Sequence, residues 1–302
     1  MHHPKVSIVV LNWNGIRDSL ECLQSIETLT YPNYEIIVVD NGSTDGSVAC
    51  LRSRYPNISI IENEKNLGFA EGNNVGIRYA FERGAHYVLL LNNDTVATPG
   101  FLDALVNVAE RDPRGGSVGP LIVHYDASRT IWSAGGQTNL FSGKIASNRR
   151  QNRPQANCAG VLRVDWISGC ALLIKADVIE KIGLLDKDYF LYLEDADWGF
   201  RARESGYLSL IDCNTQILHK VGSSLARTSY SCSYYYYFAR NTLLFFKKHG
   251  QWYHFAAFIA RFCARYGMML LWNAIRGDRA RSAYIIAGIR DYLRGKYGIY
   301  EQ

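Results

Sequence analysis

The stretch Tyr87-Val-Leu-Leu-Leu-Asn-Asn-Asp-Thr-Val-Ala-Thr98 decides the fold of this chain. Its apolar run does not alternate with polar residues, which is typical of a strand buried on both faces of a parallel sheet. Asn92, Asn93, Asp94 and Thr95 follow where this strand ends. Ligands of open α/β sheets bind at the carboxyl ends of strands, so these oxygens predict a site for Mg²⁺ or Mn²⁺. A polar turn that caps the next helix is the alternative.

Other apolar strands precede this one and alternate with helices. We predict strands over Val6 to Leu11, Tyr34 to Val39 and Ile58 to Glu62, and helices over Asp18 to Ile26, Val48 to Tyr55 and the residues up to Arg83. This order predicts an α/β fold with a mixed, mostly parallel sheet and right-handed crossovers. Every strand ends in polar or glycine-rich residues, which would together form one polar rim. The first strand lacks a following GxGxxG, and no GxxxxGK[ST] loop occurs, so a dinucleotide-binding fold and a P-loop are excluded.

The second half of the chain continues with shorter elements. Strands are predicted over Ser117 to Val123, Asp126 to Thr138, Val161 to Trp166 and Cys170 to Lys175, the last two joined by Ile167-Ser168-Gly169. The polar, basic stretch from Ser142 to Cys158 is predicted to be a mobile loop. A short helix capped by Asp177 follows.

An acidic cluster comes next, at Glu194, Asp195 and Asp197, directly before a helix predicted over Trp198 to Ser205. Clustered carboxylates repel, so we expect a cation, an arginine partner or a raised pKa on one of them. An acidic first helical turn favoured by the helix dipole is the alternative. His219 then ends another strand, as the other polar candidates do, and a glycine/serine loop is predicted to follow it.

Together these motifs resemble the GT-A family 2 inverting glycosyltransferases, and most of all their bacterial rhamnosyltransferase-like group. The resemblance spans about residues 5 to 225 and rests on Asn12-Trp13-Asn14, Val38 to Ser47, Asn66 to Ala70, Gly72-Asn73-Asn74, Leu91 to Asp94, Glu194 to Trp198, and His219. It implies a GT-A (Rossmann-like) fold with a helical C-terminal extension.

The resemblance also implies residue roles. Asp40 would contact the nucleoside, Asp94 would be the last position of the DxD metal motif, Asp195 the catalytic base and His219 a second metal ligand. The donor is expected along Asn12, Asn14, Asp40, Asn66, Gly68, Asn73, Asn93 and Asp94, and the acceptor along Trp166, Gly169, Glu194, Asp197 and Trp198. Asn92 replaces the first Asp of the motif, which leaves open how many carboxylates contact the metal.

The expected function is that of an inverting hexosyltransferase. A divalent cation neutralises a departing nucleoside diphosphate, and one carboxylate base activates an acceptor hydroxyl for a single displacement. The resemblance favours dTDP-rhamnose as donor and a glycan or polyprenyl-linked acceptor in bacterial surface polysaccharide synthesis, such as cell wall or O-antigen. A non-catalytic nucleotide-sugar or glycan-binding protein of the same fold is the alternative. Retention of both Asp94 and Asp195 argues against it.

The C-terminal part is the basic part of the chain. From Phe238 onward eleven Lys and Arg face three Asp and Glu, a local charge of +8, which leaves −3 for the preceding residues. We therefore expect a catalytic domain over residues 1–230 and a basic aromatic helical extension over 231–302. Aromatic and basic residues in the helical stretch Trp252 to Ile275 suit an anionic membrane surface. Packing on the catalytic core or on another subunit of a homo-oligomer is the alternative.

The sequence predicts neither a membrane-spanning helix nor a nucleic-acid partner. The uncharged stretch Tyr266 to Ile275 is too short to span a bilayer, which favours a peripheral position on the membrane. The tail contains no recognisable nucleic-acid-binding module, so we expect no nucleic-acid partner.

The cysteines bear on the compartment. There are seven, scattered and never in a CxxC pair, which predicts reduced thiols and neither a disulfide framework nor a zinc site. Met1 to Lys5 runs straight into a strand, so we expect no signal peptide. The predicted location is the cytoplasm, peripheral on the inner face of the cell membrane.

Overall fold

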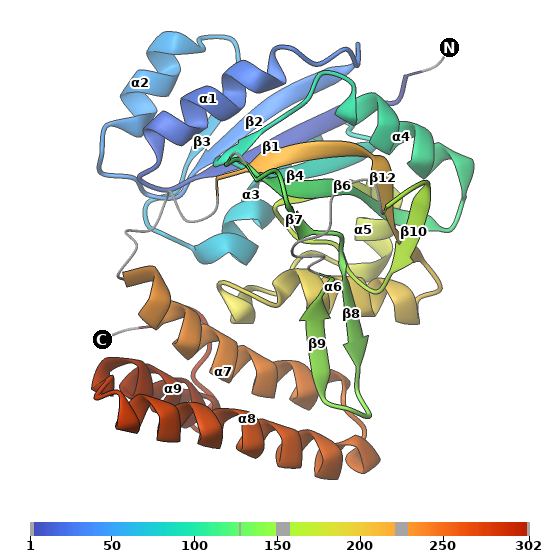
Figure 1. The fold of residues 1–302 in the computed structure, drawn as a ribbon. Coiled ribbons are helices and arrows are strands. Elements are labelled where there is room, and N and C mark those ends of the chain that lie inside the picture. Colours follow the sequence, from blue (N-terminus) through green and yellow to red (C-terminus); the bar gives the residue numbers. More distant parts are fainter. Residues whose placement is uncertain (1–2, 127, 149–157, 221–228, 301–302) are drawn as a thin grey trace.

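The computed structural model describes residues 3–126, 128–148, 158–220 and 229–300. A mixed sheet forms its centre, and helices cover both faces (Figure 1). Its strand order is β10 (Val161–Val164), β12 (Leu208–His219), β6 (Gly115–His124), β11 (Ala171–Lys175), and then β4, β1, β2 and β3. The parallel half consists of β1 (Val6–Asn12), β2 (Tyr34–Asp40), β3 (Ser59–Glu62) and β4 (Tyr87–Asn92). This confirms the predicted mostly parallel α/β fold.

The register of the parallel half aligns the strand ends. Asn12 at the end of β1 pairs with Asp40 at the end of β2, and Leu11 pairs with Asn92 of β4. The crossovers are α1 (Ile16–Ile26), α2 (Ser47–Arg54) and α3 (Gly68–Glu82), and α4 (Phe101–Arg111) follows β4 and the short β5 (Thr95–Val96). The polar residues after each strand therefore meet at one edge of the sheet, as the sequence predicts.

An antiparallel strand separates the parallel half from the rest of the sheet. β11 (Ala171–Lys175) lies between β4 and β6 (Gly115–His124) and runs antiparallel to both. Beyond it, β12 (Leu208–His219) is parallel to β6, and β10 (Val161–Val164) is antiparallel to β12. The two strands predicted to be joined by Ile167-Ser168-Gly169 exist, but β6 and β12 lie between them.

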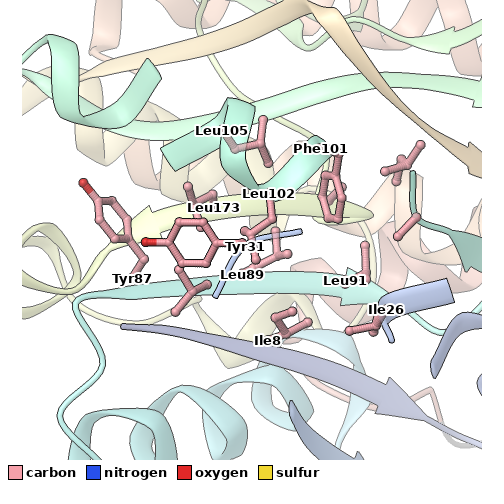
Figure 2. Packing of buried hydrophobic residues seen from close by; sticks show 14 of the residues in the cluster. Ile8, Ile26, Tyr31, Tyr87, Leu89, Leu91, Phe101, Leu102, Leu105 and Leu173 are labelled. Carbon is pink, nitrogen blue, oxygen red and sulfur yellow. The ribbon is translucent and has the colours of Figure 1, made fainter. Parts of the chain in front are cut away.

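One face of the sheet carries a large layer of buried apolar side chains. Figure 2 shows Ile8, Leu89 and Leu91 from the sheet packed with Phe101 and Leu102 of α4, and all of these side chains are buried. Each large apolar side chain buried in this way stabilises the fold by roughly 1.5–3 kcal/mol. The layer holds β4 rigidly, and with it the polar residues that follow the strand.

Several boundaries differ from the sequence prediction. The predicted strand over Asp126 to Thr138 is two strands, β7 (Ile131–Ser133) and β8 (Gly136–Asn139), and β8 forms a hairpin with β9 (Lys144–Ser147) inside the predicted loop. Residues 149–157 of the predicted loop, with Arg149, Arg150 and Arg153, lie outside the described residues. So do residues 221–224 of the loop predicted after His219. Helix α5 (Ala176–Ile182) follows Lys175 as N-cap, so Asp177 lies inside it.

The helix after the acidic cluster, α6 (Glu194–Glu204), also begins earlier than predicted. It starts at Glu194 and not at Trp198, so all three carboxylates belong to its first turn. The physical reason is the backbone at Leu193, which turns left-handed and acts as N-cap. A leucine rarely adopts that conformation, so the sequence gives no sign of it.

The prediction that all cysteines are reduced is wrong for one pair. Cys158 and Cys213 form a disulfide, whereas Cys22, Cys50, Cys170 and Cys263 are free thiols. The cause is the pairing of β10 with β12: Cys213 donates its backbone N–H to Gly160 O at 2.9 Å, which brings the chain around Cys158 alongside. Because the pair is 55 residues apart in sequence, its spacing gives no signal. The cysteine pattern therefore gives no support for a reducing compartment.

The C-terminal residues form a layer of helices beneath the sheet (Figure 1). These are α7 (Ser229–His249), the short η3 (Trp252–His254), α8 (Phe255–Ile275) and α9 (Arg279–Leu293). Buried Leu243, Phe245 and Phe246 of α7 pack with Tyr189 of η2 (Lys187–Tyr189) and with Phe200 of α6. The described part of α7 is therefore packed on η2 and α6, whereas much of α8 is exposed.

Candidate functional site

The predicted nucleoside side of the rim lies at the ends of β1 and β2. Buried Asp40 accepts a hydrogen bond from Asn12 Nδ2 at 2.7 Å and another from the backbone N–H of Ser43 at 2.8 Å. Asn12 Nδ2 also reaches Ser43 Oγ at 3.1 Å. A Cβ on Gly42 (φ +75°) would lie 2.8 Å from the Lys65 backbone, so only glycine fits this turn. The carboxylate is held rigidly, and each oxygen keeps a lone pair for a ligand.

Asn41 organises the neighbouring loop and was missing from the predicted site residues. Its side-chain amide donates to Asn66 Oδ1 at 2.9 Å and to Gly68 O at 3.0 Å, and its Oδ1 accepts from Leu67 N at 3.0 Å. Asn66 Oδ1 also accepts from Gly68 N at 2.8 Å. Asn41 lies in the segment Val38 to Ser47, one of those that carry the family resemblance, and this position is the sequence signal for its role in the site. It ties the loop after β3 to the end of β2.

The other predicted donor residues divide into exposed and interior ones. Asn14 is exposed, with its Oδ1 accepting from Thr44 N at 2.8 Å. Asn93 is turned inward and donates to Ser19 Oγ at 3.0 Å, and Asn73 donates to Phe69 O at 2.9 Å within α3. Asn93 and Asn73 therefore brace the rim from beneath.

Asp94 and His219 meet although they are distant in sequence. β5 pairs with the end of β12, so His219 lies opposite Thr95, and Lys220 N donates to Asp94 O at 3.0 Å. This brings His219 Nε2 to 3.2 Å from Asp94 Oδ1, with both side chains buried. Burial disfavours a protonated imidazole, yet Cys170 and Asp94 raise the pKa of His219 well above its usual value. This pocket therefore stabilises positive charge.

The pair fits a divalent cation. Two ligand atoms at right angles around Mg²⁺ at its usual bond length are about 3 Å apart, close to the separation found here. His219 Nδ1 has no hydrogen-bond partner within the described chain. In the described ranges no group of three or more His, Cys, Asp or Glu is placed to hold a metal ion by itself. A cation here would need oxygens from a ligand, as a diphosphate supplies.

Asp195 lies at the start of α6 and faces the start of β11. Its Oδ2 accepts from Gly169 N at 3.2 Å, and its Oδ1 accepts from Ala196 N at 2.8 Å. Burial raises the pKa of Asp195 to about 6, while the Gly169 and Ala196 N–H groups oppose that rise. Near neutral pH the carboxylate is ionised and basic enough to accept a proton, which is the property that a general base requires.

Glu194 differs from its neighbour. It is buried, and its Oε2 has no hydrogen-bond partner in the described chain. Burial, and then the charge of Asp195, raise the pKa of Glu194 well above its usual value. Burial thus raises the pKa of both adjacent carboxyl groups, and for Glu194 the charge of Asp195 adds to the rise.

The remaining predicted acceptor residues lie in the interior. Asp197 is buried and bonds to Arg201 Nε at 2.8 Å and His249 Nε2 at 2.7 Å, so it links α6 to α7. Trp198 is buried in the sheet core and donates to Gly183 O at 3.0 Å. Trp166 is buried too, with its ring against Gly136. Asp197 and Trp198 are thus buried and hydrogen-bonded within the fold, and their predicted place beside the acceptor stays a prediction.

The two halves of the site are joined through the sheet. Asn92 N donates to Cys170 O at 2.9 Å, so the chain enters β11 where β4 ends. Gly169, which binds Asp195, is therefore adjacent in the fold to the strand that precedes Asp94. A mostly parallel sheet with this rim, followed by an acidic helix start, defines the GT-A class of nucleotide-sugar transferases.

The comparisons with known proteins agree with that class. The model of glycosyl transferase family 2 matches residues 7–182, and the chain belongs to this family. It is a glycosyltransferase. The N-acetylglucosaminyl-diphospho-decaprenol L-rhamnosyltransferase of Mycobacterium tuberculosis is 30% identical over 223 residues, covering 68% of this chain and 72% of the relative. The dTDP-rhamnosyl transferase RfbF of Shigella flexneri is 24% identical over 246 residues, covering 80% and 79%.

Solved structures show the same fold. The mannosyltransferase PcManGT of Pyrobaculum calidifontis, in complex with GDP-Man and Mn²⁺, aligns with a TM-score of 0.61 at 18% identity, over 98% of this chain and 89% of its own. GalNAc-T7 with UDP, GalNAc and Mn²⁺ aligns with a TM-score of 0.58 at 15% identity, over 72% of this chain and 44% of its own. The predicted GT-A fold is thereby confirmed.

Proposed function

We propose that the protein transfers rhamnose from dTDP-rhamnose, with inversion, to a hydroxyl of a polyprenyl-linked or other glycan acceptor in surface polysaccharide synthesis. The names of the two rhamnosyltransferase relatives support the sugar and the lipid-linked acceptor. The observation that carries the chemistry is Asp195, which is ionised, fixed by Gly169, and joined through β11 to the strand before Asp94.

In this proposal the parallel half binds the donor. Asp40 accepts hydrogen bonds from the nucleoside, and the loop fixed by Asn41 lies beside it. Asp94 and His219 would hold Mg²⁺ or Mn²⁺. When bound, the cation neutralises the diphosphate and makes it a better leaving group.

The other half activates the acceptor. Asp195 accepts the proton of the acceptor hydroxyl as its oxygen attacks the anomeric carbon and the bond to the diphosphate breaks. We assign no proton transfer to Glu194, whose buried Oε2 has no hydrogen-bond partner in the described chain. The mechanism uses one carboxylate as base and no second carboxylate as nucleophile, so no covalent sugar intermediate forms. The single displacement therefore inverts the anomeric centre.

Turnover with dTDP-rhamnose tests the proposal. We expect the purified protein with Mn²⁺ and a polyprenyl-diphosphate N-acetylglucosamine acceptor to form product, with the anomeric configuration opposite to that of the donor by NMR. UDP- and GDP-sugars serve as matched controls and should react more slowly. Retained configuration would contradict the single displacement. Tight nucleotide-sugar binding without turnover for any donor would favour the non-catalytic binding protein.

We also propose that residues 1–230 perform catalysis while α8 rests on the anionic inner face of the cell membrane. Among the described residues, Trp252–Ile275 is the one helical stretch long and apolar enough to cross a membrane, and only 17% of its most apolar window is buried. The uncharged run Tyr266 to Ile275, predicted from the sequence to be too short to span a bilayer, is only the second part of this longer apolar helix. Arg261 and Arg265 lie in its first part. Large exposed apolar side chains gather on this stretch, namely Trp252, Tyr253, Phe255, Ile259, Met268, Leu271, Trp272 and Ile275.

Basic side chains beside this apolar surface support a lipid partner. Arg261, Arg265, Arg276 and Arg279 are all exposed. Each basic residue near an anionic surface contributes on the order of 1 kcal/mol, and salt screens that attraction. Apolar contact with acyl chains adds to it. A second copy of the chain is the competing occupant.

Vesicle sedimentation tests the membrane contact. The full-length protein should co-sediment with anionic phosphatidylglycerol vesicles at low salt, and binding should weaken as salt rises. Trp272→Ala with Leu271→Ala should reduce binding, whereas Arg52→Ala, on α2 of the catalytic half, should leave it unchanged. Failure to sediment at low salt, together with a dimer in solution that the double variant dissociates, would show that the helix packs against another subunit.

A further inference from the structure

The segment directly before Asp195 has an unusual backbone. Phe190 (φ +61°), Tyr192 (φ +68°) and Leu193 (φ +72°) all adopt positive φ, and none of them is glycine. Bulky residues are rarely found there, because Cβ crowds the backbone. Such a turn persists only when its surroundings determine it. We name the segment Tyr189–Leu193 the base turn, since it leads into the helix that carries Asp195.

A single side chain of α7 binds this turn along its length. Asn241 Nδ2 lies 3.0 Å from Tyr189 O, 2.8 Å from Leu191 O and 2.7 Å from Tyr192 O. These carbonyls point toward one amide because the turn is left-handed at Tyr192 and Leu193. Asn241 is fully buried, so water does not replace these bonds.

Arg240 supports the same turn from the neighbouring position. Its Nη2 donates to Asp188 O at 3.1 Å and to Tyr189 O at 2.8 Å, its Nη1 donates to Gly298 O at 2.6 Å, and its Nε donates to Asn241 Oδ1 at 2.9 Å. The guanidinium is fully buried. In the part of the chain that the structure describes, its charge faces these oxygens rather than a carboxylate. Burying a charge is unfavourable unless hydrogen bonds compensate for the lost water, and here the bonds to these oxygens do so.

The base turn connects the helices to the chemistry. Leu193 is the N-cap of α6, and its carbonyl accepts from Asp197 N at 2.9 Å, which sets where the helix starts. Asp195 follows two residues later and bonds to Gly169. On the other side, Phe190 O accepts from Phe69 N at 2.6 Å. The turn therefore lies between α7 and the side chain proposed as the base.

We propose that Arg240 and Asn241 are positioning residues, which hold the base turn in the conformation that places the Asp195 carboxylate against Gly169. The inference rests on the proposed function only for the role of Asp195 as base. Neither residue touches the substrate. The C-terminal helices thus contribute to catalysis through the backbone of residues 189–193.

Donor binding should be much less dependent on these residues than turnover. The loop from Asn66 to Gly68 is held by Asn41, and Asp40 is held by Asn12 and Ser43. These contacts lie on the parallel half of the sheet and involve no residue of α7. The base turn touches this loop only next to Gly68, where Phe190 O accepts from Phe69 N, so its loss should lower kcat more than it lowers donor affinity.

Asn241→Asp is the sharpest test. The replacement keeps the shape and can still accept from Arg240 Nε, but it has no N–H to donate and directs negative oxygens at three carbonyls. We expect kcat to fall at least tenfold, with the dTDP-rhamnose dissociation constant within threefold of wild type. Amide hydrogen exchange over residues 189–196 should become faster.

Phe246→Leu is the matched control. Phe246 is also buried on α7 and stacks on Phe258 with ring centroids 3.9 Å apart, which ties α7 to α8. Its loss should lower the melting temperature while kcat and exchange over 189–196 stay near wild type. Arg240→Lys, which keeps the charge but not the planar fork, should resemble N241D in its kinetics and takes its place if N241D does not fold.

The outcomes separate the two proposals. Wild-type kcat and unchanged exchange over 189–196 in a folded N241D protein would overturn the positioning role and leave the proposed function intact. Equal losses of kcat in N241D and Phe246→Leu would also overturn it, because they would indicate general destabilisation. Absence of transfer by the wild-type protein would count against the proposed function, while hydrogen exchange would still decide whether the two residues hold the turn.

Discussion

Replacing Asp195 by asparagine should lower turnover by roughly 10²- to 10⁴-fold, the usual loss when a general base is removed. Asparagine keeps the size of the side chain and can still accept from Gly169 N through its carbonyl oxygen. It has no basic oxygen to take the acceptor's proton. Because Asp195 lies apart from Asp40 and its partners on the parallel half, nucleotide-sugar affinity should stay near wild type. Initial rates with saturating donor and acceptor, together with calorimetry, measure the two effects.

The pH profile provides an independent check on this residue. The pKa of Asp195 is raised to about 6 by burial, and the ionised form is the active one. Wild-type kcat/KM should therefore be fully present well above pH 6 and should decline as the pH falls below that value. The Asp195→Asn variant should lose this acid limb.

Matched carboxylate variants show whether the right residue is assigned. Glu194→Gln replaces a buried carboxyl group whose pKa burial raises well above its usual value, and Asp197→Asn weakens the contacts with Arg201 and His249. The first should retain most activity, and the second should act mainly on stability. If Asp195→Asn retains activity while either of these variants loses it, the base is a different carboxylate.

Replacing Asp94 by alanine should abolish metal-dependent donor binding while the protein stays folded. The cation would lose one of its two proposed protein ligands, and His219 alone has no carboxylate to share the charge. Titration calorimetry with dTDP should show binding that requires Mn²⁺ and is removed by EDTA in the wild type. In the variant the affinity should be low and unaffected by Mn²⁺.

Neighbouring asparagines serve as controls for this experiment. Asn93→Ala removes inward bonds to Ser19 and Asn12 and should lower the melting temperature without removing the response to Mn²⁺. Asn92→Ala tests whether the position that departs from the DxD motif takes part in metal binding. Equal dTDP affinity with and without EDTA in the wild type would show that the donor binds without a cation.

The parallel half and its rim could be predicted because their signals are local. An unbroken apolar run specifies a buried strand, and parallel strands bring their polar ends to one edge, so Asp40 and Asp94 could be placed from the sequence. The contact between Asp94 and His219 depends on the pairing of β5 with β12. Strand pairing across such a separation leaves no periodic pattern, and only the family resemblance pointed to it.

Other features were hidden for different physical reasons. The disulfide between Cys158 and Cys213 follows from the β10–β12 pairing, which nothing in the cysteine spacing reveals. The start of α6 depends on a left-handed leucine, which contradicts local preference. Arg240 and Asn241 lie in an ordinary aromatic helix, and their bonds to main-chain carbonyls require no particular residue type on the other side.

The antiparallel strand β11 has a further consequence for how such enzymes diversify. Its register with β4, where Ala171 faces Leu91 and Leu172 faces Leu90, is fixed by the burial of both strands and by their main-chain hydrogen bonds. In the proposed mechanism this pairing fixes the spacing between Asp94, which follows β4, and Asp195, which bonds to Gly169 ahead of β11. Loops on the nucleotide half and helices on the acceptor half are then free to change independently. New donor and acceptor combinations can arise without the reacting atoms moving apart.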